Sequence, residues 1–239
     1  AGAYVDWLHP PLAKLIAAVS IKIFGENSFA WRAPSALMGT LLIWLVYCLA
    51  RAIFSQQKGA GLLAALITAI DGLTIAQSRI AMNDIFVTFF ATAAILNYYL
   101  YLKDRNKNIY FLGTTVMTGL ACASKWSGAT IILFILVMEL WQWLKEKKDF
   151  WLSIRNILLV CLTAAIIYLL SFFQLFQHHS WNHFVELERQ VLLYQTNLKA
   201  THPYSAPAWQ WPLGEKPVYF YLNSQTKELF GSLWFFAVH

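Results

Sequence analysis

The feature that most constrains the fold of this chain is a series of apolar stretches that approach the length of a membrane-spanning helix. A helix needs roughly 20 mostly apolar residues to cross the hydrocarbon core of a bilayer. Six stretches reach or approach that length, at residues 34–54, 60–77, 85–102, 110–124, 127–144 and 152–172. A further stretch begins near residue 229. The sequence therefore predicts an all-α, polytopic transmembrane protein.

The composition excludes several other classes of protein. Hydrophobic residues make up 59% of the 239 residues and charged residues 13%, whereas soluble globular domains average about 45–50% and about 25%. The net charge of +6 includes no dense basic block, which argues against binding to nucleic acid. The three cysteines lie in apolar stretches without CxxC spacing, so the pattern indicates neither a disulfide framework nor a zinc site.

The distribution of basic residues predicts the orientation in the membrane. The links 51–58, 103–107 and 145–155 contain two, three and four Lys or Arg residues, which is nine of the 18 in the chain. The positive-inside rule places such short basic links in the cytoplasm. The other connections then lie on the extracytoplasmic side: residues 1–33, the turns at 78–84 and 124–128, and the segment 173–228.

This topology divides the chain into four parts: an extracytoplasmic segment (1–33), a transmembrane core of about six spans (34–172), an extracytoplasmic loop (173–228) and the start of a further span (229–239). Pro10 and Pro11 are predicted to start a juxtamembrane amphipathic helix, because the first turn of a helix does not need their missing N–H donors. A second surface helix is predicted in the loop, where apolar residues recur at helical spacing: Phe184, Leu187, Val191, Tyr194 and Leu198.

Four short motifs fall on the predicted extracytoplasmic side: DWLHPPLAK at 6–14, WRAP at 31–34, QSRIAMND at 77–84 and SKWSG at 124–128. Taken singly, a charged residue at the end of a span needs no function, because hydration is easy there. Together, the motifs place four cations on the side that the positive-inside rule leaves poor in them: Lys14, Arg32, Arg79 and Lys125. Such a cluster suits an anion, and phosphate is the commonest anion at a membrane surface.

Other polar residues leave alternatives open. Asp71 lies inside a predicted span, so it is either a functional group or half of an ion pair with Arg79 or a neighbouring helix. Asp84 opens the next helix, where it either favours the helix N-terminus or orients a cation or a substrate. His179 and His183 are one helical turn apart, but no carboxylate completes an HExxH zinc motif, because Ser180 and Trp181 stand between them.

Five segments in register resemble the protein O-mannosyltransferase family, the dolichyl- or polyprenyl-phosphate-mannose-protein mannosyltransferases (glycosyltransferase family 39). They are HPPLAK, WRAPSALMGT, QSRIAMNDIFVTFF, GLACASKWSG and HPYSAPAWQWPLGEKPVYFY, and the resemblance runs from about residue 5 to residue 222. The resemblance implies a GT-C glycosyltransferase fold and a sugar donor linked to a polyprenyl phosphate. The extracytoplasmic loop has no room for a large inserted domain, so a bacterial or archaeal type is expected.

The resemblance also implies roles for individual residues. Asp6, His9 and Lys14 are expected beside the donor phosphate, and Arg32 is expected to help position the active site. Arg79 and Asp84 match a loop that lines the substrate cleft, and Lys125 matches a Lys-Trp pair of the family. The general base is expected to be a carboxylate in an Asp-Glu pair upstream of Ala1, so that the chain is expected to be an excerpt without the first span and the C-terminal spans.

The expected reaction moves mannose, or another hexose, from a polyprenyl-phosphate sugar to Ser or Thr hydroxyls of secreted proteins, with inversion. The protein is expected in the cytoplasmic membrane with its site facing outward, without a nucleic-acid partner; a divalent metal and the oligomeric state are left open. One alternative is a related GT-C enzyme that glycosylates a lipid or glycan. A second alternative is a transporter, which would favour polar or broken helices at the membrane midplane rather than charges at the outer ends.

Overall fold

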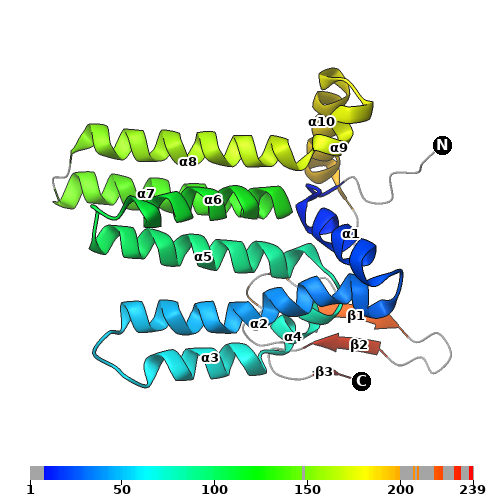
Figure 1. The fold of residues 1–239 in the computed structure, drawn as a ribbon, viewed down its shortest axis with the longest axis horizontal. Helices are drawn as coiled ribbons and strands as arrows, with labels where there is room; N and C mark the ends of the chain where they lie inside the picture. Colours follow the sequence, from blue (N-terminus) through cyan, green and yellow to red (C-terminus); the bar gives the residue numbers. More distant parts are fainter. Residues whose placement is uncertain are drawn as a thin grey trace.

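The computed structural model describes residues 8–146, 149–199, 207 and 209, together with three short strands near the C-terminus (Figure 1). The helices of this described part are α1 (Leu12–Phe24), α2 (Ser28–Ile53), α3 (Ala60–Ile70), α4 (Gly72–Arg79), α5 (Asn83–Lys103), α6 (Asn108–Ser124), the 3₁₀-helix η1 (Trp126–Ala129), α7 (Thr130–Glu146), α8 (Phe150–Ser171), α9 (Phe173–His178) and α10 (Trp181–Asn197). Figure 1 shows α2, α3, α5, α6, α7 and α8 side by side, with α1 and α10 across one end of the bundle.

The long helices match the predicted spans. Within the described residues, four are long and apolar enough to cross a membrane: α2, α5, η1 with α7, and α8. The bent pair α3 and α4 makes a fifth if it is one span. Helix α6 has only 17 residues, and it packs against both α5 and α8. These helices confirm the prediction of a multi-pass helical membrane protein.

Asp71 explains the bend of 59° between α3 and α4. Its backbone is extended, so α3 ends there, and its carboxylate Oδ2 accepts a hydrogen bond of 2.7 Å from the backbone N–H of Thr74. Asp71 is therefore the N-cap of α4. No ion pair joins Asp71 to Arg79, although the structure describes both residues. The sequence left open a functional group or an ion pair with Arg79 or a neighbouring helix; the ion pair with Arg79 is wrong.

The bundle has two chemically different ends. The basic-link end is where α2, α5 and α7 finish, next to the links 51–58, 103–107 and 145–155 (Figure 1). The motif end carries α1, the start of α2, α4 and the turn before η1, and therefore the described residues of all four sequence motifs (Figure 1). The separation of the links from the motifs agrees with the predicted topology.

Helix α1 begins after Pro11, as predicted from the Pro-Pro pair. It is tied to the bundle by Ala13, which is buried in a hydrophobic cluster with Leu42, Ile85, Phe86, Phe90 and Ala121. The Ser20 hydroxyl donates a hydrogen bond of 2.5 Å to the carbonyl oxygen of Ala30 at the start of α2. Val19 and Ile23 of α1 stay exposed.

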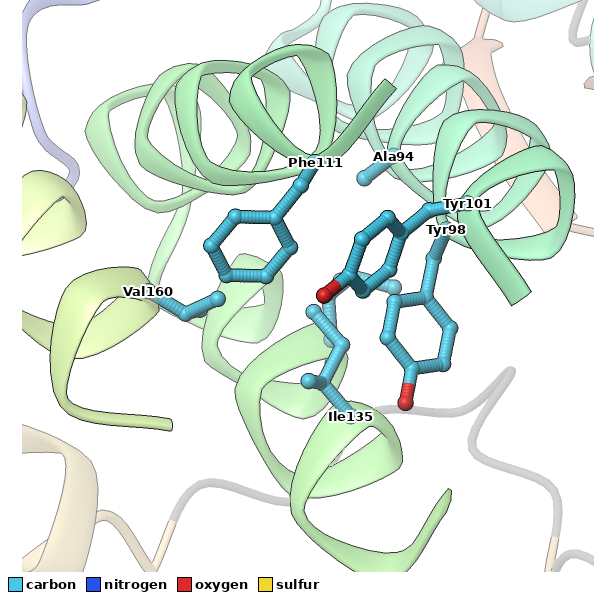
Figure 2. Close-up of a cluster of buried hydrophobic side chains, with 7 residues drawn as sticks. Ala94, Tyr98, Tyr101, Phe111, Ile135 and Val160 are labelled. Atoms are coloured by element: carbon cyan, nitrogen blue, oxygen red, sulfur yellow. The ribbon is translucent and has the colours of Figure 1, made fainter. Parts of the chain in front are cut away.

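A second hydrophobic cluster lies closer to the basic-link end (Figure 2). It joins Tyr98 and Tyr101 of α5 to Phe111 of α6, Ile135 of α7 and Val160 of α8. Next to it lies Glu139 of α7, which is completely buried. Its carboxylate accepts hydrogen bonds from three side chains and pairs with a guanidinium: Tyr98 at 2.9 Å, Asn156 and Ser153 at 3.0 Å, and Arg105 at 3.6 Å.

Near the C-terminus, β1 (Val218–Leu222), β2 (Leu229–Ser232) and β3 (Ala237–Val238) form an antiparallel sheet in the order β1-β2-β3. This differs from the prediction that a further span begins near residue 229. Aromatic residues favour strands as well as spans. The Tyr- and Phe-rich β1 pairs with β2, which begins at residue 229. Most of the predicted loop after Lys199 lies outside the described residues.

Candidate functional site

The first predicted site residues lie around the start of α1. Asp6 lies outside the described residues. Lys14 Nζ donates a hydrogen bond of 3.0 Å to the carbonyl oxygen of His9, which holds the HPP turn against the first turns of α1. His9 and Lys14 are both partly buried. The structure therefore brings these two residues together.

Asp84 and Lys125 form an ion pair with a distance of 2.8 Å between Oδ1 and Nζ. Asp84 lies in the first turn of α5, and Lys125 follows the last residue of α6. Their side chains are 27% and 28% exposed, so the pair is partly open to solvent. Of the roles that the sequence left open for Asp84, orienting a cation agrees with this contact.

The turn that carries Lys125 is held tightly against α6. Lys125 is extended, with φ −160° and ψ 145°, so its direction is not fixed by a helix. Gly128 N–H donates a hydrogen bond of 2.9 Å to the carbonyl oxygen of Lys125. A Cβ at Gly128 would overlap the backbone of Ala121, so only glycine permits this close approach.

Trp126, the next residue, starts a chain of hydrogen bonds that the sequence did not predict. Trp126 Nε1 donates to the Tyr168 hydroxyl at 2.9 Å, and that hydroxyl lies 3.0 Å from both carboxylate oxygens of Glu188. The chain links η1 to α8 and α10. Burial raises the pKa of Glu188. Two residues away, hydrogen bonds from Gln190 and Arg189 lower the pKa of the exposed Glu186.

Arg32 and Arg79 are exposed at the same end of the bundle. Arg32 lies in the first turn of α2, with its guanidinium carbon 4.6 Å from the centroid of the Trp31 ring. Arg79 is the last residue of α4, and α4 packs against α2. Within the described part of the chain, neither arginine has an ion-pair partner. Both guanidinium groups are therefore available to an anion.

An open pocket of about 310 Å³ lies where α1, α9 and α10 meet. Lys14 and His9 line it together with His178 and His179 of α9, and Leu15 of α1 contributes apolar surface. The two histidines are further candidate residues, of which His179 had been considered only as a metal ligand together with His183. The described residues contain no group of three or more His, Cys, Asp or Glu that could hold a metal ion.

These features define the class of the protein. It is a multi-pass helical membrane protein with several cations at the motif end, one of which, Lys125, pairs with Asp84. The family model of the dolichyl-phosphate-mannose-protein mannosyltransferases matches residues 8–169, which include every described site residue except Glu188, His178 and His179. The chain belongs to this family.

Relatives agree with this assignment. The chain is 33% identical over 155 residues to the polyprenol-phosphate-mannose–protein mannosyltransferase of Mycolicibacterium smegmatis, covering 56% of the chain and 30% of that protein. It is 28% identical over 280 residues to the protein of the same name from Mycobacterium tuberculosis, covering 91% of the chain and 53% of that protein. The chain thus spans about half the length of these relatives or less.

The fold resembles that of the Saccharomyces cerevisiae protein O-mannosyltransferase Pmt1–Pmt2 complex bound to the sugar donor. The TM-score is 0.55 with 19% sequence identity, over 98% of the chain and 38% of the yeast chain. This likeness confirms the predicted GT-C architecture.

Proposed function

We propose that the full-length protein transfers mannose, or another hexose, from a polyprenyl phosphate to Ser or Thr hydroxyls of secreted proteins. The observation that carries the proposal is the cation set of the motif end. Arg32 and Arg79 are exposed without ion-pair partners in the described residues, and Lys125 is held by Asp84. Curated members of the family are named for a polyprenol-phosphate-mannose donor, whose phosphate is the anion that such a set suits.

In the proposed reaction, the acceptor hydroxyl oxygen forms a bond to the anomeric carbon from the face opposite the phosphate. The bond between that carbon and the phosphate oxygen breaks, which inverts the sugar and releases polyprenyl phosphate. The hydroxyl proton passes to a carboxylate base, expected upstream of His9. Negative charge grows on the departing phosphate, and cations at the edge of the bilayer stabilise it strongly because the local dielectric constant is low.

Each described residue then has a role in this proposal. Arg79 and Lys125 bind the phosphate, and Asp84 holds the Lys125 ammonium in place. Arg32, near the start of α2, helps to position the active site. Lys14 and His9 lie beside the donor phosphate at the start of α1. The donor already carries its activated sugar on a lipid, so the site lies at helix ends near the membrane surface. In this proposal the motif end faces away from the cytoplasm, as the basic links predict.

A transfer assay with the purified full-length protein tests the proposal. Arg79→Ala is expected to lower transfer from polyprenyl-phosphate-mannose to a Ser/Thr peptide by about 100-fold, because a cation next to the leaving group is lost. Lys58→Ala is the matched control, since Lys58 is an exposed cation at the basic-link end. Equal activity of the Arg79 and Lys58 variants would refute the assignment of Arg79 to the cleft.

The same preparation separates the two alternatives. Label that appears in lipid while Ser/Thr peptides stay unlabelled would point to the related enzyme with a lipid or glycan acceptor. Solute flux in liposomes without any sugar transfer would identify a transporter and overturn the proposal.

A further inference from the structure

We propose that Glu188 and Tyr168 are positioning residues for Lys125, which they orient through Trp126. The inference rests on the proposed function, because it concerns the cation that binds the donor phosphate. It assigns a task to α10, a helix of the extracytoplasmic loop that lies beyond the matched family region.

The backbone of Lys125 has an extended conformation. This residue lies between the end of α6 and the start of η1, so its side chain has no helical neighbours to fix its direction. The backbone of Lys125 is held by its own N–H, which donates to the Ala121 carbonyl oxygen at 3.1 Å, and by the N–H of Gly128, which donates to its carbonyl oxygen at 2.9 Å. Two further contacts bear on its side chain: the ion pair with Asp84 and the position of the adjacent Trp126. A shift of Trp126 therefore moves Lys125, because consecutive Cα atoms are held about 3.8 Å apart.

The hydrogen bonds of Trp126 have a single possible direction. An indole N–H can only donate, so Tyr168 accepts from Trp126 at 2.9 Å and directs its own proton to Glu188 at 3.0 Å. An ionised carboxylate at the end of this chain makes the Tyr168 bond charge-assisted, and such bonds are about twice as strong as neutral ones. Glu188 thus sets the position of the Tyr168 hydroxyl, and that hydroxyl sets the position of the indole.

Aromatic packing holds α10 in the position from which Glu188 can accept the hydrogen bond of Tyr168. The Tyr168 ring contacts Phe172 with centroids 5.2 Å apart, and Phe172 contacts the buried Phe184 of α10 at 5.1 Å. Phe184 and Glu188 are four residues apart and share one face of α10. The helix therefore presents an apolar and an acidic contact to the end of α8 together, across the end of the bundle (Figure 1).

Steady-state kinetics of the full-length enzyme test the inference. Tyr168→Phe keeps the ring and removes the hydroxyl, Trp126→Phe removes the indole donor, and Glu188→Gln removes the charge. Each is expected to raise KM for polyprenyl-phosphate-mannose about five- to tenfold and to leave KM for the acceptor peptide unchanged. Glu186→Gln is the matched control on the same helix, since Glu186 bonds only to Arg189 and Gln190 among the described residues.

A double variant shows whether Tyr168 acts through Lys125. Lys125→Ala with Tyr168→Phe is expected to have the same donor KM as Lys125→Ala alone, because the residue being positioned is absent. Effects that multiply would overturn the inference, and so would a fall in kcat alone with both KM values unchanged, which indicates loss of folded enzyme. If Lys125→Ala keeps the wild-type donor KM, the inference fails together with the role of Lys125, while transfer by the wild-type enzyme still supports the proposed function.

Discussion

The two ends of the helical bundle differ in the burial and pairing of the charged side chains compared below. At the basic-link end, Glu139 is completely buried and both of its carboxylate oxygens accept hydrogen bonds. At the motif end, the Asp84–Lys125 pair is about a quarter exposed, and Arg32 and Arg79 have no ion-pair partner in the described residues. The basic-link end thus contains a buried carboxylate whose partners all lie within the protein, whereas the charged residues of the candidate site are partly or fully exposed.

The difference separates a structural cluster from the site that we propose to bind the donor. A carboxylate inside a membrane protein is costly unless it is paired and hydrogen-bonded, and the partners of Glu139 come from α5, α8 and the link after α5. Such a group fixes how the helices pack. Cations that stay exposed and unpaired add little to stability. In the proposed function, the cations of the motif end bind the donor phosphate.

Removal of Glu139 is expected to have the largest effect of the changes considered. Glu139→Ala leaves the guanidinium of Arg105, whose side chain is 18% exposed, without its carboxylate. The free energy of unfolding is expected to fall by about 3–5 kcal/mol. Thermal unfolding of the full-length protein in detergent measures this, with the exposed Glu186→Gln as the control. An unchanged Tm for Glu139→Ala would show that the two ends do not differ in the way described.

A smaller effect is expected at Glu188, the half-buried acid of the motif end. Burial raises its pKa in the folded protein above the ordinary value of 4.5. The folded state therefore binds the proton more tightly than the unfolded state, and this contribution to stability is present below pH 4.5 and is lost as the pH rises through the raised pKa.

A comparison of Tm against pH for wild type and Glu188→Gln tests this sign. The wild type is expected to lose stability relative to the variant as the pH rises from about 4 to neutrality. A difference that stays constant with pH, or one that runs in the opposite direction, would place Glu188 in the same class as exposed acids such as Glu186.

The sequence predicted those parts of the fold that depend on hydrophobic length. The spans 34–54, 85–102 and 152–172 correspond to α2, α5 and α8, because a run of about 20 apolar residues has few other stable arrangements in a bilayer. The start of α1 was also predictable, since proline is favoured at the beginning of a helix. The basic links and the motifs lie at opposite ends because successive connections between spans alternate between the two sides of the membrane.

The contacts between helices could not be predicted in this way. The hydrogen-bond donors to Glu139 lie 41 residues before it (Tyr98) and 14 and 17 residues after it (Ser153 and Asn156). Trp126 and Tyr168 are 42 residues apart. Such pairs depend on the rotation and tilt of each helix, which hydropathy does not determine. The role of Asp71 was missed for a related reason, because capping depends on a backbone break that the apolar run conceals.

The measurement that tests the central claim most directly is the affinity of the full-length protein for polyprenyl phosphate, determined together with Tm for one variant at each end. Lys125→Ala is expected to raise Kd about tenfold with little change in Tm, because a partly exposed ion pair adds little stability. Tyr98→Phe removes one donor to Glu139 and is expected to lower Tm while Kd stays unchanged. Unchanged affinity in Lys125→Ala, or weaker binding in Tyr98→Phe, would contradict the division of the molecule into a structural end and a phosphate-binding end.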